Sequence, residues 1–160
     1  MLAKEIMSRD PQVITPDDSL RDAARLMADY DCGCLPVVED KAGMQVVGVL
    51  TDRDISVRGV ARGKTPDSKV NDVMSPAPAC AFEDDEVDEV ERIMVEKQVR
   101  RVPVVDRDER VVGMIAQADL ATNDRAASDR DVGRLVEKIS APVTPRRTTT
   151  RGDSQPEQRL

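Results

Sequence analysis

Histidine and tryptophan are absent from this chain, and its 160 residues include one phenylalanine and one tyrosine. Without imidazole groups, the chain has no histidine general base, no Ser-His or Cys-His nucleophile pair, and none of the usual histidine ligands for zinc. The shortage of aromatic rings removes the stacking platforms of single-strand and RNA binders. The formal net charge is −7, whereas nucleic-acid binders need a positive field. We therefore expect no enzyme and no nucleic-acid binding.

Long apolar runs are also absent, so nothing approaches the about 20 residues that span a membrane. The N-terminal segment Met1–Pro11 carries four charged residues, Lys4, Glu5, Arg9 and Asp10, and no apolar core of a secretory signal. We therefore expect a cytoplasmic protein without a membrane partner. Its three cysteines are then expected as reduced thiols, not as a disulfide framework.

The chain contains two copies of one sequence pattern. Segments of the first copy recur 67 residues later, in the pairs Met7-Ser8 and Met74-Ser75, Asp17-Asp18 and Asp84-Asp85, and Leu35–Val38 and Val102–Val105. The offset then falls to 65, because the first copy has a longer loop at Glu39–Gln45, and the later pairs are Val46-Val47-Gly48 with Val111-Val112-Gly113 and Asp54 with Asp119.

Each copy predicts the same order of elements, β-α-β-β-α. In the first copy these are an extended segment at Gln12–Thr15, a helix capped by Ser19 with Leu20, Ala23, Ala24 and Met27 on one face, a hairpin of Leu35–Val38 and Val46–Leu50, and a helix from about Asp52. In the second they are Ala79–Phe82, a helix with Val87, Val90, Ile93 and Met94, a hairpin of Val102–Val105 and Val111–Ile115, and a helix from about Gln117. The pattern predicts an α+β fold in which two repeats pack through their sheets with pseudo-twofold symmetry.

Composition divides the chain into five segments. We expect repeat 1 at 1–58, a linker at 59–68 that contains Gly63 and Pro66, and repeat 2 at 69–124 with a short helix through Val70–Met74. A helical extension is expected at 125–141, because Val132, Leu135, Val136 and Ile139 fall on one side. The Pro-, Thr- and Arg-rich segment 142–160 is expected to be disordered.

The most informative segment runs from strand into helix at Gly48–Ile55. The Thr51 hydroxyl, the free N–H groups of the helix start and Arg53 together suit an anion. Asp54 lies about one turn into the helix, where a carboxylate can accept two hydrogen bonds from a ribose diol. Thr and Asp also cap ordinary strand-to-helix joins, so this segment alone leaves both interpretations open.

The corresponding segment of repeat 2 is less complete. Ala116 stands in place of the hydroxyl residue and Ala118 in place of the arginine, while Asp119 keeps the carboxylate. A lost hydrogen bond to a charged group costs about 1.5–3 kcal/mol, although Arg101 could compensate from the hairpin. We therefore expect the cleft at Asp54 to bind a ligand more tightly than the cleft at Asp119.

Two further motifs have alternative interpretations. Arg100-Arg101 is either a solvated or salt-bridged pair at a strand entry, or a phosphate clamp with bidentate donors. Cys32-x-Cys34 places two thiols on one face of an extended chain. They are either small apolar filling of a tight cleft or half of a metal site, for which only Cys80 offers a further thiol, and we expect no metal.

The repeat, the Leu-Pro-Val-Val hairpins and the Gly-x-x-Thr-x-x-Asp segment together resemble the CBS domain family over Leu2–Ala121. Thr51–Ile55 and Gln98–Val104 are similar to standalone bacterial two-CBS proteins such as the hypoxic response protein group. The resemblance implies a Bateman module, in which two CBS repeats associate through their sheets, and a homodimer of such modules. It also implies clefts for AMP, ADP, ATP or S-adenosylmethionine, lined by Cys32, Gly33, Cys34, Val99, Arg100 and Arg101, with ribose held by Asp54 or Asp119 and assisted by Thr51.

From this resemblance we expect a regulatory, nucleotide-binding module that senses an adenosine-containing ligand and signals to an unknown protein target in trans. No cofactor is required for that role, and the adenine nucleotide or S-adenosylmethionine is its regulatory ligand. The alternative is a CBS protein that binds no nucleotide and acts as an interaction protein in a stress or hypoxia response.

Overall fold

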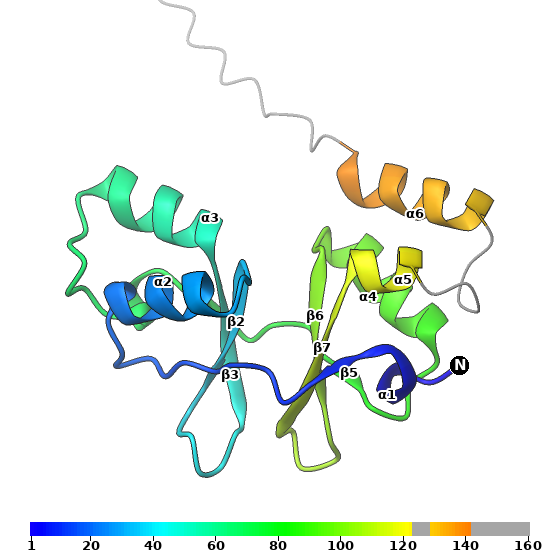
Figure 1. The fold of residues 1–160 in the computed structure, drawn as a ribbon, viewed down its shortest axis with the longest axis horizontal. Coiled ribbons are helices and arrows are strands. Elements are labelled where there is room, and N and C mark those ends of the chain that lie inside the picture. The colour runs from blue at the N-terminus through cyan, green and yellow to red at the C-terminus, as the bar shows by residue number, and fades with distance from the viewer. Residues whose placement is uncertain (123–128, 142–160) are drawn as a thin grey trace, which may run out of the picture.

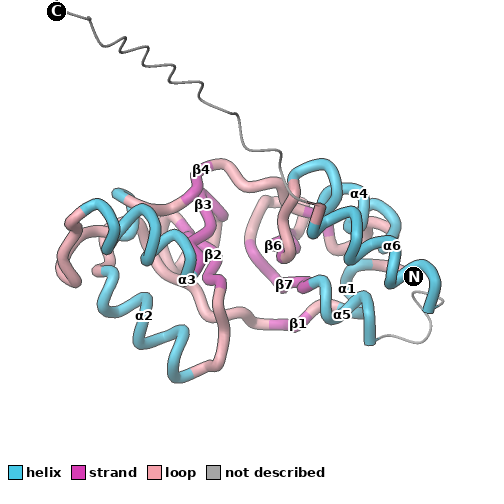
Figure 2. The backbone as a smooth tube through the Cα atoms, turned by 90° about the horizontal axis from the view of Figure 1, so that it is seen from above, coloured by secondary structure: helices cyan, strands magenta, loops and turns pink. Residues whose placement is uncertain are grey.

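Two β-hairpins, one from each repeat, lie side by side in the middle of the computed structural model, and the helices lie on the outer sides (Figures 1 and 2). The structure describes residues 1–122 and 129–141. The first half contains α1 (Ala3–Ile6), β1 (Ser8–Arg9), α2 (Leu20–Asp29), β2 (Cys34–Val38), β3 (Val46–Thr51) and α3 (Asp52–Asp54). The second half contains β4 (Ser75–Pro76), β5 (Ala81–Phe82), α4 (Val87–Lys97), β6 (Arg101–Val105), β7 (Val111–Ala116), α5 (Gln117–Thr122) and α6 (Asp129–Ser140).

The first strand of each repeat pairs with a strand in the sheet of the other repeat. Strand β1 pairs antiparallel with β7, and β4 pairs antiparallel with β3. The sheets therefore have the strand orders β1-β7-β6-β5 and β2-β3-β4. This exchange joins the repeats through backbone hydrogen bonds, and the repeat pattern in the sequence does not predict it.

The hairpins follow the predicted α+β arrangement closely. The β2–β3 and β6–β7 pairs are antiparallel, and β5 lies parallel to β6. In repeat 1 the expected extended segment Gln12–Thr15 contributes a single parallel bridge, between Ile14 and Val37. The two hairpin tips also meet, since the N–H of Val111 donates to the carbonyl of Met44 at 2.9 Å. Two mixed sheet-and-helix repeats packed through their sheets are thus confirmed.

Helices α2 and α4 cover the outer side of their hairpins. Ser19 caps α2 as predicted, because its Oγ accepts a hydrogen bond from the N–H of Asp22 at 3.1 Å. Of the four residues predicted on one face of α2, Leu20, Ala23 and Met27 are buried and Ala24 is exposed. The helix needs three apolar positions per two turns to cover this small hairpin, and the fourth faces outward. All four predicted core residues of α4 are buried, namely Val87, Val90, Ile93 and Met94.

The helix that begins at α3 continues beyond the expected end of repeat 1. A π-helical turn at Ile55–Gly59 and a 3-10 turn at Val60–Arg62 follow Asp54 directly. Gly63 ends this run with φ of +75°, a left-handed conformation that glycine adopts without a steric penalty. The helix expected through Val70–Met74 is a 3-10 turn at Val70–Asp72.

Helix α6 follows repeat 2 and packs on α4 and α5 through the buried side chains of Leu135 and Ile139. The segment 142–160, which the sequence predicts as disordered, lies outside the described residues. Among the described helices, none has the length and apolar character needed to cross a membrane.

Candidate ligand clefts between the two repeats

Two pockets lie between the repeats. The first cleft, of about 630 Å³, is lined by Cys34, Val49, Thr51, Asp52, Arg53, Gln98, Val99, Arg100, Arg101, Ile139, Ser140 and Ala141. The second cleft, of about 390 Å³, is lined by Ser8, Asp10, Pro11, Gln12, Tyr30, Asp31, Cys32, Cys34, Arg101, Met114, Ala116 and Asp119. Both clefts draw residues from both repeats, so a bound ligand would contact the two halves at once.

Three arginines give the first cleft its positive charge. Arg53 comes from the start of repeat 1's second helix, and Arg100 and Arg101 come from the entry of β6. Within residues 1–122 and 129–141, their guanidinium groups make no ion pair or hydrogen bond, and Asp52 is the sole acidic residue among the residues that line the cleft. Guanidinium groups without protein partners are well suited to bind phosphate.

Gly33 leaves room for charged groups at the edge of the clefts. A Cβ atom at this position would lie 3.0 Å from Oδ2 of Asp52 and 3.6 Å from Nη1 of Arg101. The carbonyl of Gly33 accepts the N–H of Asp52 at 3.1 Å, which joins the start of α3 to the entry of β2. Gly33 itself is not among the residues that line either cleft.

Thr51 and Asp54 cap the helix that begins at α3. The N–H of Asp54 donates to Oγ1 of Thr51 at 3.1 Å, and the N–H of Thr51 donates to Oδ2 of Asp54 at 3.0 Å. The other carboxylate oxygen of Asp54 lies 3.9 Å from Nε of Arg58, and the side chain is 14% exposed. Asp54 lines neither cleft. The structure therefore gives Asp54 a capping role, and its contact with ribose stays a prediction.

Asp119 occupies the equivalent position in repeat 2 and lines the second cleft. Its Oδ2 accepts the N–H of Ala116 at 2.7 Å, as Asp54 accepts from Thr51. Ala116 has no hydroxyl to return the bond, which leaves this cap half complete.

The second cleft differs in charge from the first. Asp10, Asp31 and Asp119 line it, and Arg101 is its one basic residue. Tyr30, with 57% exposure, adds an aromatic ring at its edge. The second cleft is thus better suited to a cationic ligand group than to a polyphosphate.

Cys34 lines both clefts, and Cys32 lines the second. Burial raises the pKa of the Cys34 thiol to about 11, even though the nearby Arg101 acts in the opposite direction. Cys34 is therefore a neutral thiol at physiological pH, which agrees with its interpretation as small apolar filling. The part of the chain that the structure describes contains no group of three His, Cys, Asp or Glu residues that could hold a metal.

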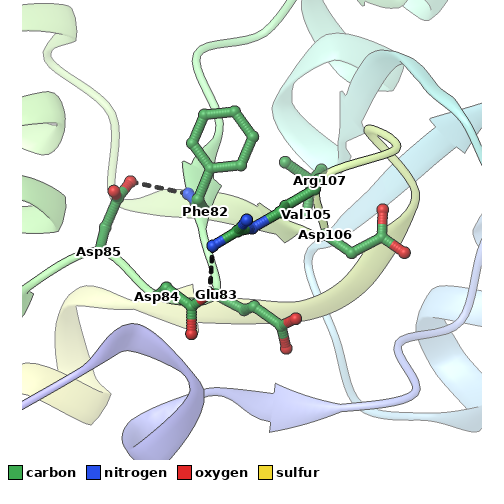
Figure 3. A pocket seen from close by; sticks show the side chains of 7 residues that line it. All are labelled: Phe82, Glu83, Asp84, Asp85, Val105, Asp106 and Arg107. Carbon is green, nitrogen blue, oxygen red and sulfur yellow. Dashed lines mark hydrogen bonds and ion pairs between the residues drawn. The ribbon is translucent and has the colours of Figure 1, made fainter.

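A third hollow lies outside the clefts, at the ends of β5 and β6 (Figure 3). It is lined by Phe82, Glu83, Asp84, Asp85, Val105, Asp106 and Arg107. Three of its four acidic groups have partners in the protein: Asp85 accepts the N–H of Phe82 at 2.7 Å, Asp84 pairs with Lys4 and Arg107, and Asp106 accepts the N–H groups of Asp108 and Arg110 at 2.9 and 3.0 Å. These contacts support the turns and link them to α1 through Lys4, so we assign no ligand to this hollow.

The structure brings most of the predicted site residues together, but it divides them between two clefts. Thr51, Arg53 and Arg100 line the first, Cys32 and Asp119 line the second, and two residues line both, Cys34 and Arg101.

The predicted site residues did not include Gln98 and the end of α6 in the first cleft, or Ser8, Asp10, Pro11 and Gln12 in the second. The repeated Met-Ser and Pro residues were a signal for Ser8–Gln12, whereas nothing in the sequence places Ile139 beside Arg53.

Comparison with known proteins agrees with this architecture. The CBS domain family model matches residues 3–58 and 70–125. The chain is 39% identical to the YlbB protein of Bacillus subtilis over 78% of this chain and 86% of that protein. It is 30% identical to hypoxic response protein 1 of Mycobacterium tuberculosis over 88% of this chain and 95% of that protein. A match at 34% identity to inosine-5′-monophosphate dehydrogenase of Methanocaldococcus jannaschii covers 84% of this chain but 26% of that enzyme.

Solved structures show the same fold. The structure of Hypoxic Response Protein I with two coordinated zinc ions superposes with a TM-score of 0.70 at 31% identity, over 77% of this chain and 98% of that chain. The CBS domain pair of protein MJ0100, in complex with 5′-methylthioadenosine and S-adenosyl-L-methionine, has a TM-score of 0.68 at 30% identity, over 76% and 93%. CBSX2 in complex with AMP has a TM-score of 0.65 at 25% identity, over 86% and 97%. The two family matches cover most of the chain, and the chain belongs to the CBS domain family as a tandem pair of CBS domains.

Proposed function

We propose that this chain is a regulatory module that binds an adenosine-containing ligand between its CBS domains and signals its occupancy to a partner protein in trans, working as a homodimer and not as an enzyme. The observation that carries the proposal is the first cleft, in which Arg53, Arg100 and Arg101 have no protein partner among the described residues. Binding of AMP or S-adenosyl-L-methionine by structurally similar CBS proteins supports it.

Charge indicates which ligand suits each cleft. A nucleotide with several phosphates fits the three arginines of the first cleft, while Val49 and Val99 supply apolar surface for a base. The sulfonium and amino groups of S-adenosylmethionine fit the second cleft with Asp10, Asp31 and Asp119. We therefore assign a ligand to each cleft by its charge. The expected difference in affinity between a cleft at Asp54 and a cleft at Asp119 does not serve for this purpose, because Asp54 lines neither cleft.

Signalling follows from the position of the clefts between the repeats. Arg53 belongs to repeat 1 and Arg100 to repeat 2, so one phosphate chain that contacts both favours the arrangement that brings them together. A ligand shifts a conformational equilibrium by its differential affinity for the two states. A partner that recognises one arrangement would therefore respond to the nucleotide.

Thermal unfolding of the purified chain tests the proposal. Five compounds are each added at equal concentration: adenosine, AMP, ADP, ATP and S-adenosylmethionine. A true ligand raises the midpoint temperature through mass action, because a concentration a hundredfold above Kd raises the free energy of unfolding by about 2.7 kcal/mol. We expect ATP and ADP to give larger shifts than adenosine, because the arginines recognise phosphate.

Inorganic tripolyphosphate is the matched control for phosphate charge alone. A shift with tripolyphosphate equal to that with ATP would contradict recognition of adenosine. Unchanged midpoints with all five adenosine compounds would contradict the proposal and favour an interaction protein without a nucleotide.

A further inference from the structure

The last turn of α6 reaches the first cleft, although this helix follows both CBS domains in the sequence. Ile139, Ser140 and Ala141 line the same cleft as Arg53 and the entry of β6. Figure 1 shows α6 on the outer side of α4 and α5, with its C-terminal end directed toward the middle of the molecule. A ligand in the first cleft would therefore lie against α6 as well as against the two repeats.

Two buried side chains anchor the described part of α6 on the rest of the fold. Among the side chains that the structure describes on this helix, Leu135 and Ile139 are buried, at 6% and 5% exposure, while Val136 is 41% exposed. A helix of 12 residues is marginal in water without tertiary packing. Elements with few buried contacts open at a lower free-energy cost than the core. Helix α6 is thus an element whose docking a ligand can shift.

Gln98 connects the cleft to α6. It ends α4 in the left-handed region, with φ of +53°, and it lines the first cleft. Its Nε2 donates to the carbonyl of Val95 at 2.8 Å and to the carbonyl of Lys138 at 3.1 Å. One side chain therefore contacts the cleft, the end of α4 and the last turn of α6.

We propose that α6 is a movable wall of the first cleft, that occupancy of the cleft stabilises the docked position of α6, and that Gln98 is the positioning residue for this coupling. The inference rests on the proposed function, because it requires an adenosine nucleotide in the first cleft. Coupling between two binding events is reciprocal. Docked α6 raises the affinity for nucleotide, and nucleotide raises the fraction of molecules in which α6 is docked. A partner protein that binds one position of α6 would therefore respond to the nucleotide.

Hydrogen exchange measured by mass spectrometry on the full chain tests the coupling, with ATP as the probe. The readout is the ratio of exchange rates without and with saturating ATP, in peptides from α6 and in peptides from β3 and β6. We expect ATP to slow exchange in α6 by about threefold or more, as it does in the cleft strands, because ligand contacts oppose local opening.

The variant Gln98→Gly removes the amide without backbone strain, since glycine adopts positive φ freely. We expect the ATP-dependent ratio in α6 to fall toward 1, and the affinity for ATP to fall by about two- to tenfold, the equivalent of one hydrogen bond. The matched control is Glu109→Gly, which makes the same kind of change at φ of +61° in the β6–β7 hairpin, outside both clefts.

Each outcome separates the inference from the proposed function. Protection of β3 and β6 by ATP with unchanged exchange in α6 would overturn the coupling and leave nucleotide binding intact. Unchanged exchange everywhere would overturn both. A Gln98→Gly variant that keeps the wild-type ratio in α6, as Glu109→Gly should, would overturn the role of Gln98.

Discussion

Cys34 and Arg101 occupy equivalent positions in the two repeats, and both line both clefts. Cys34 opens β2 opposite Thr51, and Arg101 opens β6 opposite Ala116. The pseudo-twofold relation thus places a buried neutral thiol on one side of the centre and, on the other, a guanidinium group without an ion pair to any residue that the structure describes. Since both residues line both clefts, the difference in charge between the clefts comes from their other lining residues, Arg53 and Arg100 in the first and Asp10, Asp31 and Asp119 in the second.

Because Arg101 is shared, we expect Arg101→Ala to weaken binding in both clefts, whereas Arg53→Ala weakens binding in the first alone. Loss of a charge-assisted hydrogen bond costs about 1.5–3 kcal/mol, or about ten- to a hundredfold in affinity. Isothermal titration with ATP and, separately, with S-adenosylmethionine measures the two clefts. Arg107→Ala is the control, since Arg107 is 90% exposed and lies outside both clefts. Equal losses from Arg53→Ala and Arg101→Ala with both ligands would contradict the assignment.

Cys34 gives stability a dependence on alkaline pH. Burial raises the pKa of its thiol to about 11 in the folded chain, so the folded state favours the protonated form. The contribution to stability is complete below the ordinary thiol pKa of about 9, and it is lost as the pH rises from there through about 11. We expect the free energy of unfolding, measured in urea, to fall between pH 8 and pH 10.5. The fall should be smaller in the Cys34→Ala variant than in the wild type, by on the order of 2 kcal/mol.

Other groups also titrate in this range, so the comparison between wild type and Cys34→Ala carries the test. Burial raises the pKa of Cys80 in the same direction, to about 11, and Cys80→Ala should flatten the slope as well. Identical slopes in wild type and Cys34→Ala would show that the thiol is not buried as described.

The half-complete cap of repeat 2 predicts a stabilising substitution. Ala116→Thr supplies a hydroxyl that can accept the N–H of Asp119, as Thr51 accepts the N–H of Asp54 at 3.1 Å. A side-chain cap stabilises a helix start by about 0.5–2 kcal/mol, so we expect the midpoint of thermal unfolding to rise. Ala116→Val has the same shape without the hydroxyl, and an equal rise in that variant would refute the capping explanation.

The sequence predicts the local elements well because local signals specify them. The serine cap of α2, the two hairpins and the starts of α3 and α5 follow from capping residues, alternating apolar runs and the repeat itself. Ser19 and Asp52 are found where these signals place them. Arg53, Arg100 and Arg101 were also predicted to lie near a ligand, and the first cleft brings them together.

Long-range relations could not be predicted in the same way. Pairing of Ser8 with Met114 joins residues more than 100 positions apart through a strand of two residues, which is too short to show a period of alternation. The reciprocal cap of Thr51 and Asp54 is local, and the sequence pattern left it open beside the ribose contact, because the same residue types at the same spacing serve both. The end of α6 reaches the first cleft through tertiary packing alone.

The strand exchange explains why a glycine and a methionine recur in both copies. It also predicts that a side chain in place of Gly113 destabilises the chain. Gly113 of β7 lies under Met7, which leads into β1, and a Cβ at Gly113 would lie 2.8 Å from Cγ and 3.0 Å from Cβ of Met7. Gly48 has the same relation to Met74, whose Sδ would lie 2.9 Å away. Contacts with atoms near the Met7 backbone cannot be relieved by rotating the end of the side chain. We therefore expect Gly113→Ala to lower the free energy of unfolding by about 1–3 kcal/mol.

Chemical denaturation of Gly113→Ala measures this cost, and Gly133→Ala is the matched control. A Cβ at Gly133 meets nothing within 4 Å, and alanine in a helix is more stable than glycine by about 0.5–1 kcal/mol. The same substitution should therefore destabilise the chain at the exchanged strand and be neutral or stabilising in α6. If Gly113→Ala is as stable as wild type, then Met7 does not pack on β7, and the exchange of first strands between the two CBS domains is not as described.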